Sequence, residues 1–229
     1  MQSREWEYFM ENYYGDPYMM WHDGIDEKSV THLKGEEREK AEDMLIESLT
    51  EGNHYAAKGL RELRSAKAIP TLVMNLFSGS GTLTVEIAVA LCMIKDTFEY
   101  VPHIINVLKN HVFWTSRMDA ARALRRFPTE EVVEALYETV AKDPDYLVRN
   151  HASETILFLH GLEPDISEHM EIFQLMIVEY DKADESSIEN AFSHYQKCSD
   201  MLREHVDREG TLRSGSIIED VWSWSDSNG

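Results

Sequence analysis

The chain has 229 residues, of which 43% are apolar, and a formal net charge of −20 at pH 7. This apolar fraction excludes wholesale disorder, and the longest apolar runs, such as residues 87–94, are too short to cross a membrane. The negative charge disfavours duplex nucleic acid as a ligand, because that binding depends on neutralising phosphates with basic side chains. An acidic surface suits a protein partner with a basic surface, and maintenance of solubility is the alternative.

The cellular compartment is inferred from the N-terminus and the cysteines. The first residues show no basic and apolar signal segment, and the sequence holds only Cys92 and Cys198. Cys92 lies within an apolar stretch, where we expect a buried and unreactive thiol. These features favour a cytoplasmic protein.

The N-terminal segment, residues 1–34, is rich in aromatic and acidic residues. A helix is predicted over residues 2–14, a break at residues 15–17, and a cluster of large apolar residues at 18–21. We expect this segment to cap the helices that follow, because the open end of a helical array exposes apolar surface. A binding site formed by the aromatic residues is the alternative.

A helix is predicted over residues 35–50, and one helical phrase then occurs four times between residues 53 and 161. The phrase contains a small residue that recurs at intervals of 31, 33 and 32, as Ala57, Ala88, Ala121 and Ser153. A second apolar phrase follows each of the first three copies, and both phrases space apolar residues by three and four, as on one helix face. Helix pairs of this kind bury their apolar faces only by stacking, which predicts an all-α fold, an α-solenoid.

The last two copies share a further motif. Residues 143–152 contain an acidic turn, then Val-Arg, then two small residues, and Arg117 lies four residues before its small residue as Arg149 does. Pro70 and Pro102 stand near the start of second helices. At these positions the chain resembles the HEAT-like repeat family of the short, PBS-lyase type. The resemblance implies a right-handed superhelix of antiparallel helix pairs, with second helices lining the concave groove and with the two arginines bonding turn carbonyls.

We therefore divide the chain into four segments. These are a cap at 1–34, a repeat array at 35–180, a C-terminal capping helix at 181–207 and a tail at 208–229. Within them, residues 164–180 are predicted to be the partner helix of the fourth repeat, and residues 184–206 the closing helix. The tail is Gly- and Ser-rich with large apolar residues, so disorder and folding back onto the last helices both stay open.

The sequence lacks the signatures of most catalytic and metal sites. Residues 78–81 read Ser-Gly-Ser-Gly, but no Gly-Lys-Ser follows, which favours a turn between helices over a phosphate loop. No histidines stand at His-x-x-x-His spacing, and Cys-x-x-Cys and Gly-x-Ser-x-Gly are absent. The repeated His-Glu pairs on which the HEAT-repeat enzyme deoxyhypusine hydroxylase relies are absent too. We expect no catalytic residue, no metal and no cofactor.

The candidate partner-binding residues lie on second helices and in the basic middle of the chain. Positions 71, 74, 75 and 78, with their equivalents in later repeats, are expected to face away from the core. This face either binds a partner or is an ordinary solvated helix face. Residues 53–127 hold 10 basic and 5 acidic residues, whose arginines are expected to meet an anionic patch or to pair with the next repeat. Trp114 is either an interface residue or packing between helix pairs. The predicted partner-binding residues are His103, Asn106, Asn110, Trp114, Arg122, Arg125, Arg126 and Glu138.

These features favour a non-enzymatic adaptor or inhibitor that grips one protein partner. The most specific version of this hypothesis is an acidic immunity protein that neutralises a basic toxin. The alternatives are an enzyme of the phycobilin-lyase or alkylpurine-DNA-glycosylase type, which share the HEAT-like fold, and a structural subunit of a larger assembly.

Overall fold

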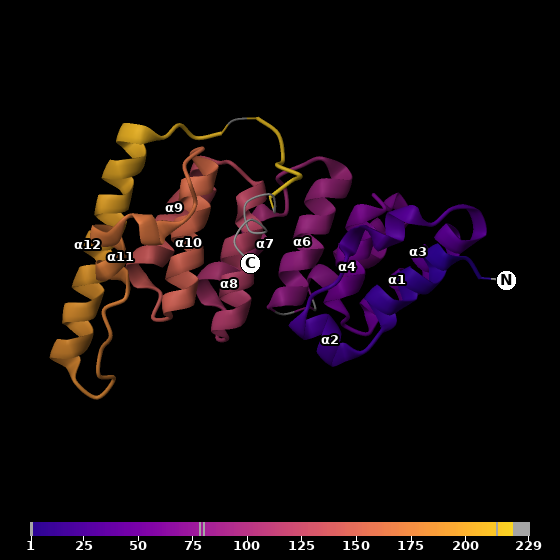
Figure 1. Cartoon of the computed structure of the whole chain (residues 1–229), viewed down its shortest axis with the longest axis horizontal. Coiled ribbons are helices and arrows are strands. Elements are labelled where there is room, and N and C mark those ends of the chain that lie inside the picture. Colours follow the sequence, from indigo (N-terminus) through magenta and orange to yellow (C-terminus); the bar gives the residue numbers. More distant parts are fainter. Residues whose placement is uncertain (1, 78, 80, 214, 222–229) are drawn as a thin grey trace. The chain divides into compact units, whose positions relative to one another are not determined.

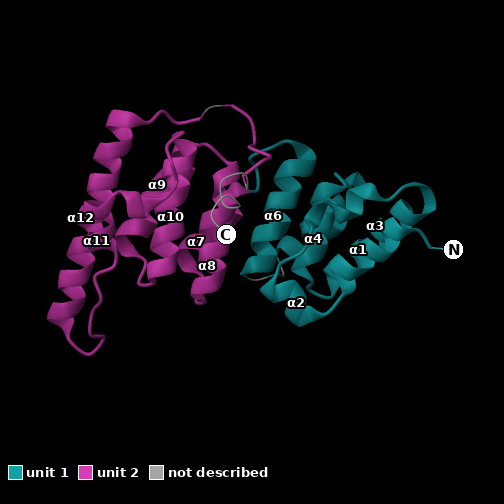
Figure 2. Ribbon diagram, viewed as in Figure 1, with its two compact units in different colours: residues 1–100 teal, residues 101–229 magenta. Residues whose placement is uncertain are grey.

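The computed structural model describes residues 2–77, 79, 81–213 and 215–221, and over these residues the chain is all-α, without a strand (Figure 1). The predicted fold class is therefore confirmed at this level. The chain divides into two compact units, residues 1–100 and 101–229, which we describe separately (Figure 2). None of the described helices is both long and apolar enough to cross a lipid bilayer.

Unit 1 arranges its main helices in two layers. Helices α4 and α6 pack together in one layer, α3 and α5 in the other, and α4 also contacts α3. The elements of unit 1 are α1 (Arg4–Tyr14), α2 (Pro17–His22), η1 (Glu27–His32), α3 (Gly35–Thr50), α4 (His54–Glu62), η2 (Ala66–Ala68), α5 (Ile69–Leu76) and α6 (Thr82–Lys95). The predicted helices over 2–14 and 35–50 are confirmed.

The aromatic N-terminal segment behaves in two different ways. Helix α1 buries Trp6, Phe9 and Tyr13, and the Tyr13 ring lies against α4 beside Gly59. Helix α2 instead leaves Tyr18 and Trp21 largely exposed. The aromatic face of α1 thus packs against its neighbours, whereas α2 presents its aromatic rings to solvent.

Unit 2 repeats the two-layer arrangement. Helices α8 and α10 pack together in one layer, while α7, α9 and α12 follow one another in the second. The elements of unit 2 are α7 (Val101–Asn110), α8 (Trp114–Ala123), η3 (Leu124–Arg126), α9 (Glu130–Lys142), α10 (Tyr146–Leu159), η4 (Ile166–Glu168), α11 (Met170–Met176) and α12 (Glu185–Glu209). Thr129 caps α9, since its hydroxyl accepts a hydrogen bond from the Val132 amide at 3.3 Å.

The repeated small residue is fully buried in all four copies. Ala57, Ala88, Ala121 and Ser153 are each 0% exposed, and so is the apolar residue three positions later in every copy. These positions lie on α4, α6, α8 and α10, which pack as the pairs α4 with α6 and α8 with α10. Small side chains at the contact allow two helix backbones to approach closely, which explains the recurrence.

The helix predicted over 164–180 is wrong in its extent. The Asp165 side chain caps a separate 3-10 turn, His169 leaves helical geometry, and α11 spans only Met170–Met176. The β-branched pair Ile177-Val178, which has low helix propensity, follows its end. Helix α12 packs beside α9, the place expected for the partner helix of the fourth repeat, and it also contacts α11 (Figure 2).

The described part of the tail folds back onto unit 2. The Thr211 amide donates to the His160 carbonyl at 3.0 Å, and the Ile218 amide donates to the Arg126 carbonyl at 2.9 Å. Ile217 and Val221 are buried. Residues 211–213 and 215–221 therefore lie against the C-terminal ends of α10 and η3, while the rest of the predicted tail, residues 222–229, lies outside the described residues.

Candidate functional site: an exposed apolar edge of unit 2

Two buried arginines join three loops along one edge of unit 2. Arg117 of α8 forms a two-pronged ion pair with Asp143, with Nε to Oδ2 at 2.7 Å and Nη2 to Oδ1 at 3.0 Å. The same guanidinium donates to the His111 carbonyl at 2.8 Å. The hydrogen bonds to Asp143 raise the pKa of Arg117. The loop before α8 and the loop before α10 are thereby held side by side.

Arg149 of α10 continues the row. Its guanidinium donates to the Asp143 carbonyl at 2.7 Å and to the Met176 carbonyl at 2.7 and 3.2 Å, and it stacks on the Tyr195 ring at 3.7 Å. Burial lowers its pKa. Both arginines bond turn carbonyls, but those that accept from Arg117 belong to the loop directly before its own helix. Arg117 reaches the loop before α10 through the Asp143 carboxylate instead.

Large apolar side chains stand exposed on these three loops and at the first residues of α8 and α10. We call this set the apolar edge, and its members with their exposed fractions are Val112 (81%), Phe113 (67%), Trp114 (40%), Tyr146 (37%), Leu147 (39%) and Ile177 (42%). Single exposed apolar residues are normal on a protein surface, but a group gathered on adjoining loops marks an interaction site. The loops hold their positions because the arginines that join them are buried.

The repeat explains where two of the aromatic rings of the apolar edge lie. Trp114 and Tyr146 are the first residues of α8 and α10, and each stands three residues before a buried arginine. Residues three apart lie on adjacent positions of a helix surface, so each buried arginine holds the first turn directly beside the partly exposed ring. Tyr146 also meets the edge of the Phe173 ring, with ring centroids 6.3 Å apart.

The surroundings of the apolar edge are acidic. The connection from α11 into α12 holds Glu179, Asp181, Asp184 and Glu185 against Lys182 alone. Asp184 caps α12, and its hydrogen bonds from Ser186 lower its pKa, so its charge persists in mild acid. A partner that covers the apolar edge therefore meets negative charge beside it.

The predicted residues of the second helices lie on a different face of unit 2. On α7, Asn106 and Asn110 are exposed and hydrogen-bonded to each other at 2.9 Å, and His103 is half-buried. On α9, Glu138 bridges Lys109 and Lys142 at 2.5 and 2.9 Å, and these ammonium groups lower its pKa to about 2.

Helix α12 covers part of this face. A groove of about 490 Å³ between α7, α9 and α12 remains, with Ala135 and Ser199 in its lining. The expectation that the whole row faces away from the core is wrong for Val107, Ala135 and Thr139, which are buried. The physical reason on α9 is the packing of α12, whose Ser199 hydroxyl donates to the Tyr137 carbonyl at 3.0 Å.

The predicted arginines turn toward the protein itself. Arg125 donates to Glu154 at 2.9 Å and to Thr155 at 3.1 Å, and burial lowers its pKa. Arg126 is buried and donates to the tail carbonyl of Glu219 at 2.6 Å. Arg122 lies half-buried on α8. Of the eight predicted site residues, Trp114 is the one on the apolar edge.

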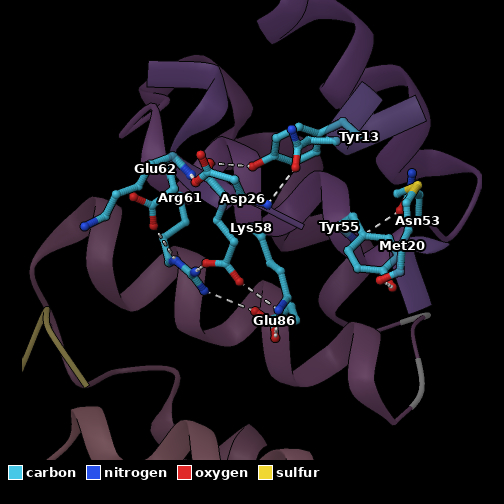
Figure 3. A network of polar contacts seen from close by, with 12 residues as sticks. Tyr13, Met20, Asp26, Asn53, Tyr55, Lys58, Arg61, Glu62 and Glu86 are labelled. Atoms are coloured by element: carbon cyan, nitrogen blue, oxygen red, sulfur yellow. Dashed lines mark hydrogen bonds and ion pairs between the residues drawn. The ribbon is translucent and has the colours of Figure 1, made fainter. Parts of the chain in front are cut away.

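Unit 1 contains a cluster of partly buried charges that the sequence interpretation missed (Figure 3). Arg61 of α4 pairs with Glu27 of η1, with Glu86 of α6 at 3.1 Å and with its neighbour Glu62 at 3.2 Å. Lys58 pairs with Glu27 at 2.8 Å. Each of these carboxylates meets a cation, so the cluster fastens η1 and α6 to α4 rather than holding groups ready for chemistry.

The structure also bears on metal-binding groups and on the two cysteines. No group of three or more His, Cys, Asp or Glu side chains in the described ranges is placed to hold a metal ion. Cys92 and Cys198 are both buried, and burial raises the pKa of Cys198 to about 12, which keeps its thiol protonated. Comparisons with protein-family models, with curated proteins and with solved structures found no match to this chain.

Proposed function

We propose that this is a non-enzymatic protein-binding protein and that the apolar edge is its main contact surface. The observation that carries the proposal is the exposure of six large apolar side chains on loops fixed by Arg117 and Arg149. Preformed loops lose little conformational freedom when a partner binds, which favours affinity. Phe113 and Trp114 are the central candidates, since aromatic residues carry a large share of interface binding energy.

The partner we expect is a protein that combines a basic surface with an apolar patch. The apolar edge supplies contact area, while the acidic connection beside it favours Lys and Arg on the partner and speeds encounter with it. The narrower form of the proposal is an inhibitor of a basic toxin domain. Inhibition of such a domain at one equivalent would support that form.

We also propose that the helix pairs are HEAT-like repeats of an α-solenoid. The support is the burial of the repeated small residue in four copies, the layered packing within each unit, and the arginines that bond turn carbonyls in two successive copies. An experimental structure of the whole chain tests this proposal. Repeats related by one constant right-handed rotation would support it, and a closed bundle would refute it.

The binding proposal is tested with a double variant of the apolar edge, Phe113→Ser with Trp114→Ser. The matched control is Trp21→Ser, which removes a more exposed tryptophan from unit 1. Proteins captured from the native host by the wild type are purified and their affinities are then measured directly. We expect the edge variant to weaken binding of a basic partner by at least about 30-fold, as loss of one interface hot spot does, and the control to leave it unchanged.

Two results would overturn the binding proposal. One is a partner bound equally well by the wild type and the edge variant, which would move the contact elsewhere. The other is a partner whose contact surface is acidic, or whose affinity does not fall between about 50 and 500 mM salt, since screening must weaken an attraction between opposite charges.

A further inference from the structure

Two histidine rings face each other at the junction of α11 and α12. His169 precedes the first residue of α11, and His205 lies in the last third of α12. Their ring centroids are 4.3 Å apart and the rings are inclined by 54°. The pair lines a pocket of about 380 Å³. Neither histidine belongs to the apolar edge.

The separation of the rings fits two imidazoles that share one metal ion. Metal–nitrogen distances of about 2.0–2.1 Å place the centroids of two such rings roughly 4.5–5 Å apart for angles of about 90–109° at the metal. The observed 4.3 Å between the rings of His169 and His205 lies just below that range. Binding of a shared ion would therefore require the two rings to move slightly apart.

The remaining donors that line the pocket are two thioethers, Met170 and Met201, and two carboxylates, Glu171 and Glu204. Met201 lies four residues before His205, on the same face of α12, and Met170 directly follows His169; both methionines line the same pocket. In the described ranges no third His, Cys, Asp or Glu joins the pair in a metal-binding group, which leaves the site short of the usual zinc donors. Thioether and imidazole ligands together favour monovalent copper.

Charged side chains of both signs line the pocket, since Glu171 and Glu204 lie in it with Arg208, so the choice of ion rests on the soft donors. Arg208 lies in the same pocket, with its Nη2 3.5 Å from Nδ1 of His205. A fixed positive charge at this distance repels a divalent cation about twice as strongly as a monovalent one. Replacing Arg208 by a neutral residue should therefore strengthen the binding of monovalent and divalent cations alike. The gain should be larger for a divalent cation.

We propose that His169, His205 and Met201 form a binding site for a soft monovalent metal ion, Cu(I), with Met170 as a further thioether donor. The site is independent of the proposed protein-binding function. It uses residues from the end of η4, the start of α11 and the end of α12, so a bound ion would link these segments.

The test uses Ag(I), a redox-inert analogue of Cu(I), titrated into the full chain in chloride-free buffer and followed by calorimetry and by NMR of the histidine side chains. We expect one saturable site, with shifts at His169 and His205. His169→Gln and His205→Gln should each weaken it at least about 100-fold, since loss of outer-shell groups alone costs up to about that much. Met201→Leu, which conserves volume, should weaken it at least about tenfold.

The matched control is His194→Gln, which removes another histidine of α12 that lies outside the pocket and should leave affinity unchanged. Circular dichroism of each variant verifies folding. Several results would overturn the proposal: Zn(II) bound more tightly than Ag(I), retention of the site in the His205 variant, equal weakening by the His194 variant, or only weak binding at several exposed methionines.

Discussion

The ion pair between Arg117 and Asp143 should couple strongly, because it is buried. Their side chains are 11% and 6% exposed, and two hydrogen bonds join them. Two unit charges about 4 Å apart attract by about 1 kcal/mol in water and by about 4 kcal/mol at the effective dielectric constant of about 20 near a protein surface. Breaking a buried pair from one side costs about 3–5 kcal/mol. We expect a coupling energy of about 2–4 kcal/mol.

The assay is a double-mutant cycle of Arg117→Met, Asp143→Asn and the double variant, with unfolding free energies from urea titrations followed by circular dichroism. The structure provides a control with the same two-pronged geometry, Arg203 with Glu134 at 2.6 and 2.8 Å, whose side chains are 42% and 62% exposed. That pair should couple by about 0.2–1 kcal/mol. Equal coupling in the two cycles would refute the argument that burial sets the strength of this link.

Three further predictions concern the interior. Gly59→Ala should lower the unfolding free energy by about 1–3 kcal/mol in urea titrations, because the added methyl would lie 2.9 Å from atoms of Leu45 and Tyr13. Burial lowers the pKa of Lys58, but two carboxylates raise it more, so its folded pKa lies above the ordinary 10.5. The stabilisation that Lys58 contributes is therefore full below pH 10.5 and is lost as the pH rises through the folded pKa. The difference in unfolding free energy between the wild type and Lys58→Met should therefore shrink as the pH rises above 10.5, and a constant difference would contradict this. Tyr137→Phe should leave the unfolding free energy unchanged or raise it by up to about 1 kcal/mol, because the buried hydroxyl has no hydrogen-bond partner in the described structure.

The sequence predicted the helical register well. Ala57 and Ser153 lie almost a hundred residues apart, yet both are fully buried at the helix contact that the repeat implied. This succeeds because periodicity is a local property: a stripe of apolar residues at spacings of three and four has one buried face whatever covers it. The same reasoning predicted the closing helix over residues 184–206, which the structure shows as α12.

The partners of each face could not be predicted in the same way. Arg61 and Lys58 lie on α4 among residues of the repeat phrase, but the carboxylates that neutralise them, Glu27 and Glu86, come from segments about 25–34 residues away. Single-sequence periodicity does not report such pairings. The exposed position of Tyr146 was missed because an apolar residue at the start of a helix reads as part of the buried stripe.

The largest difference concerns which surface is available to a partner. Analogy with HEAT-like repeats placed the site on the second helices, but α12 packs along α9 and takes up part of that face. The loops on the apolar edge receive no such cover: Val112 and Phe113 keep most of their surface in solvent although the adjoining Arg117 is buried. Exposed apolar side chains lower solubility, and a polar substitution in a surface loop would remove that cost with little effect on stability. The proposed binding to another protein would give that exposure a use, and Trp114 is the side chain whose loss should test it most directly.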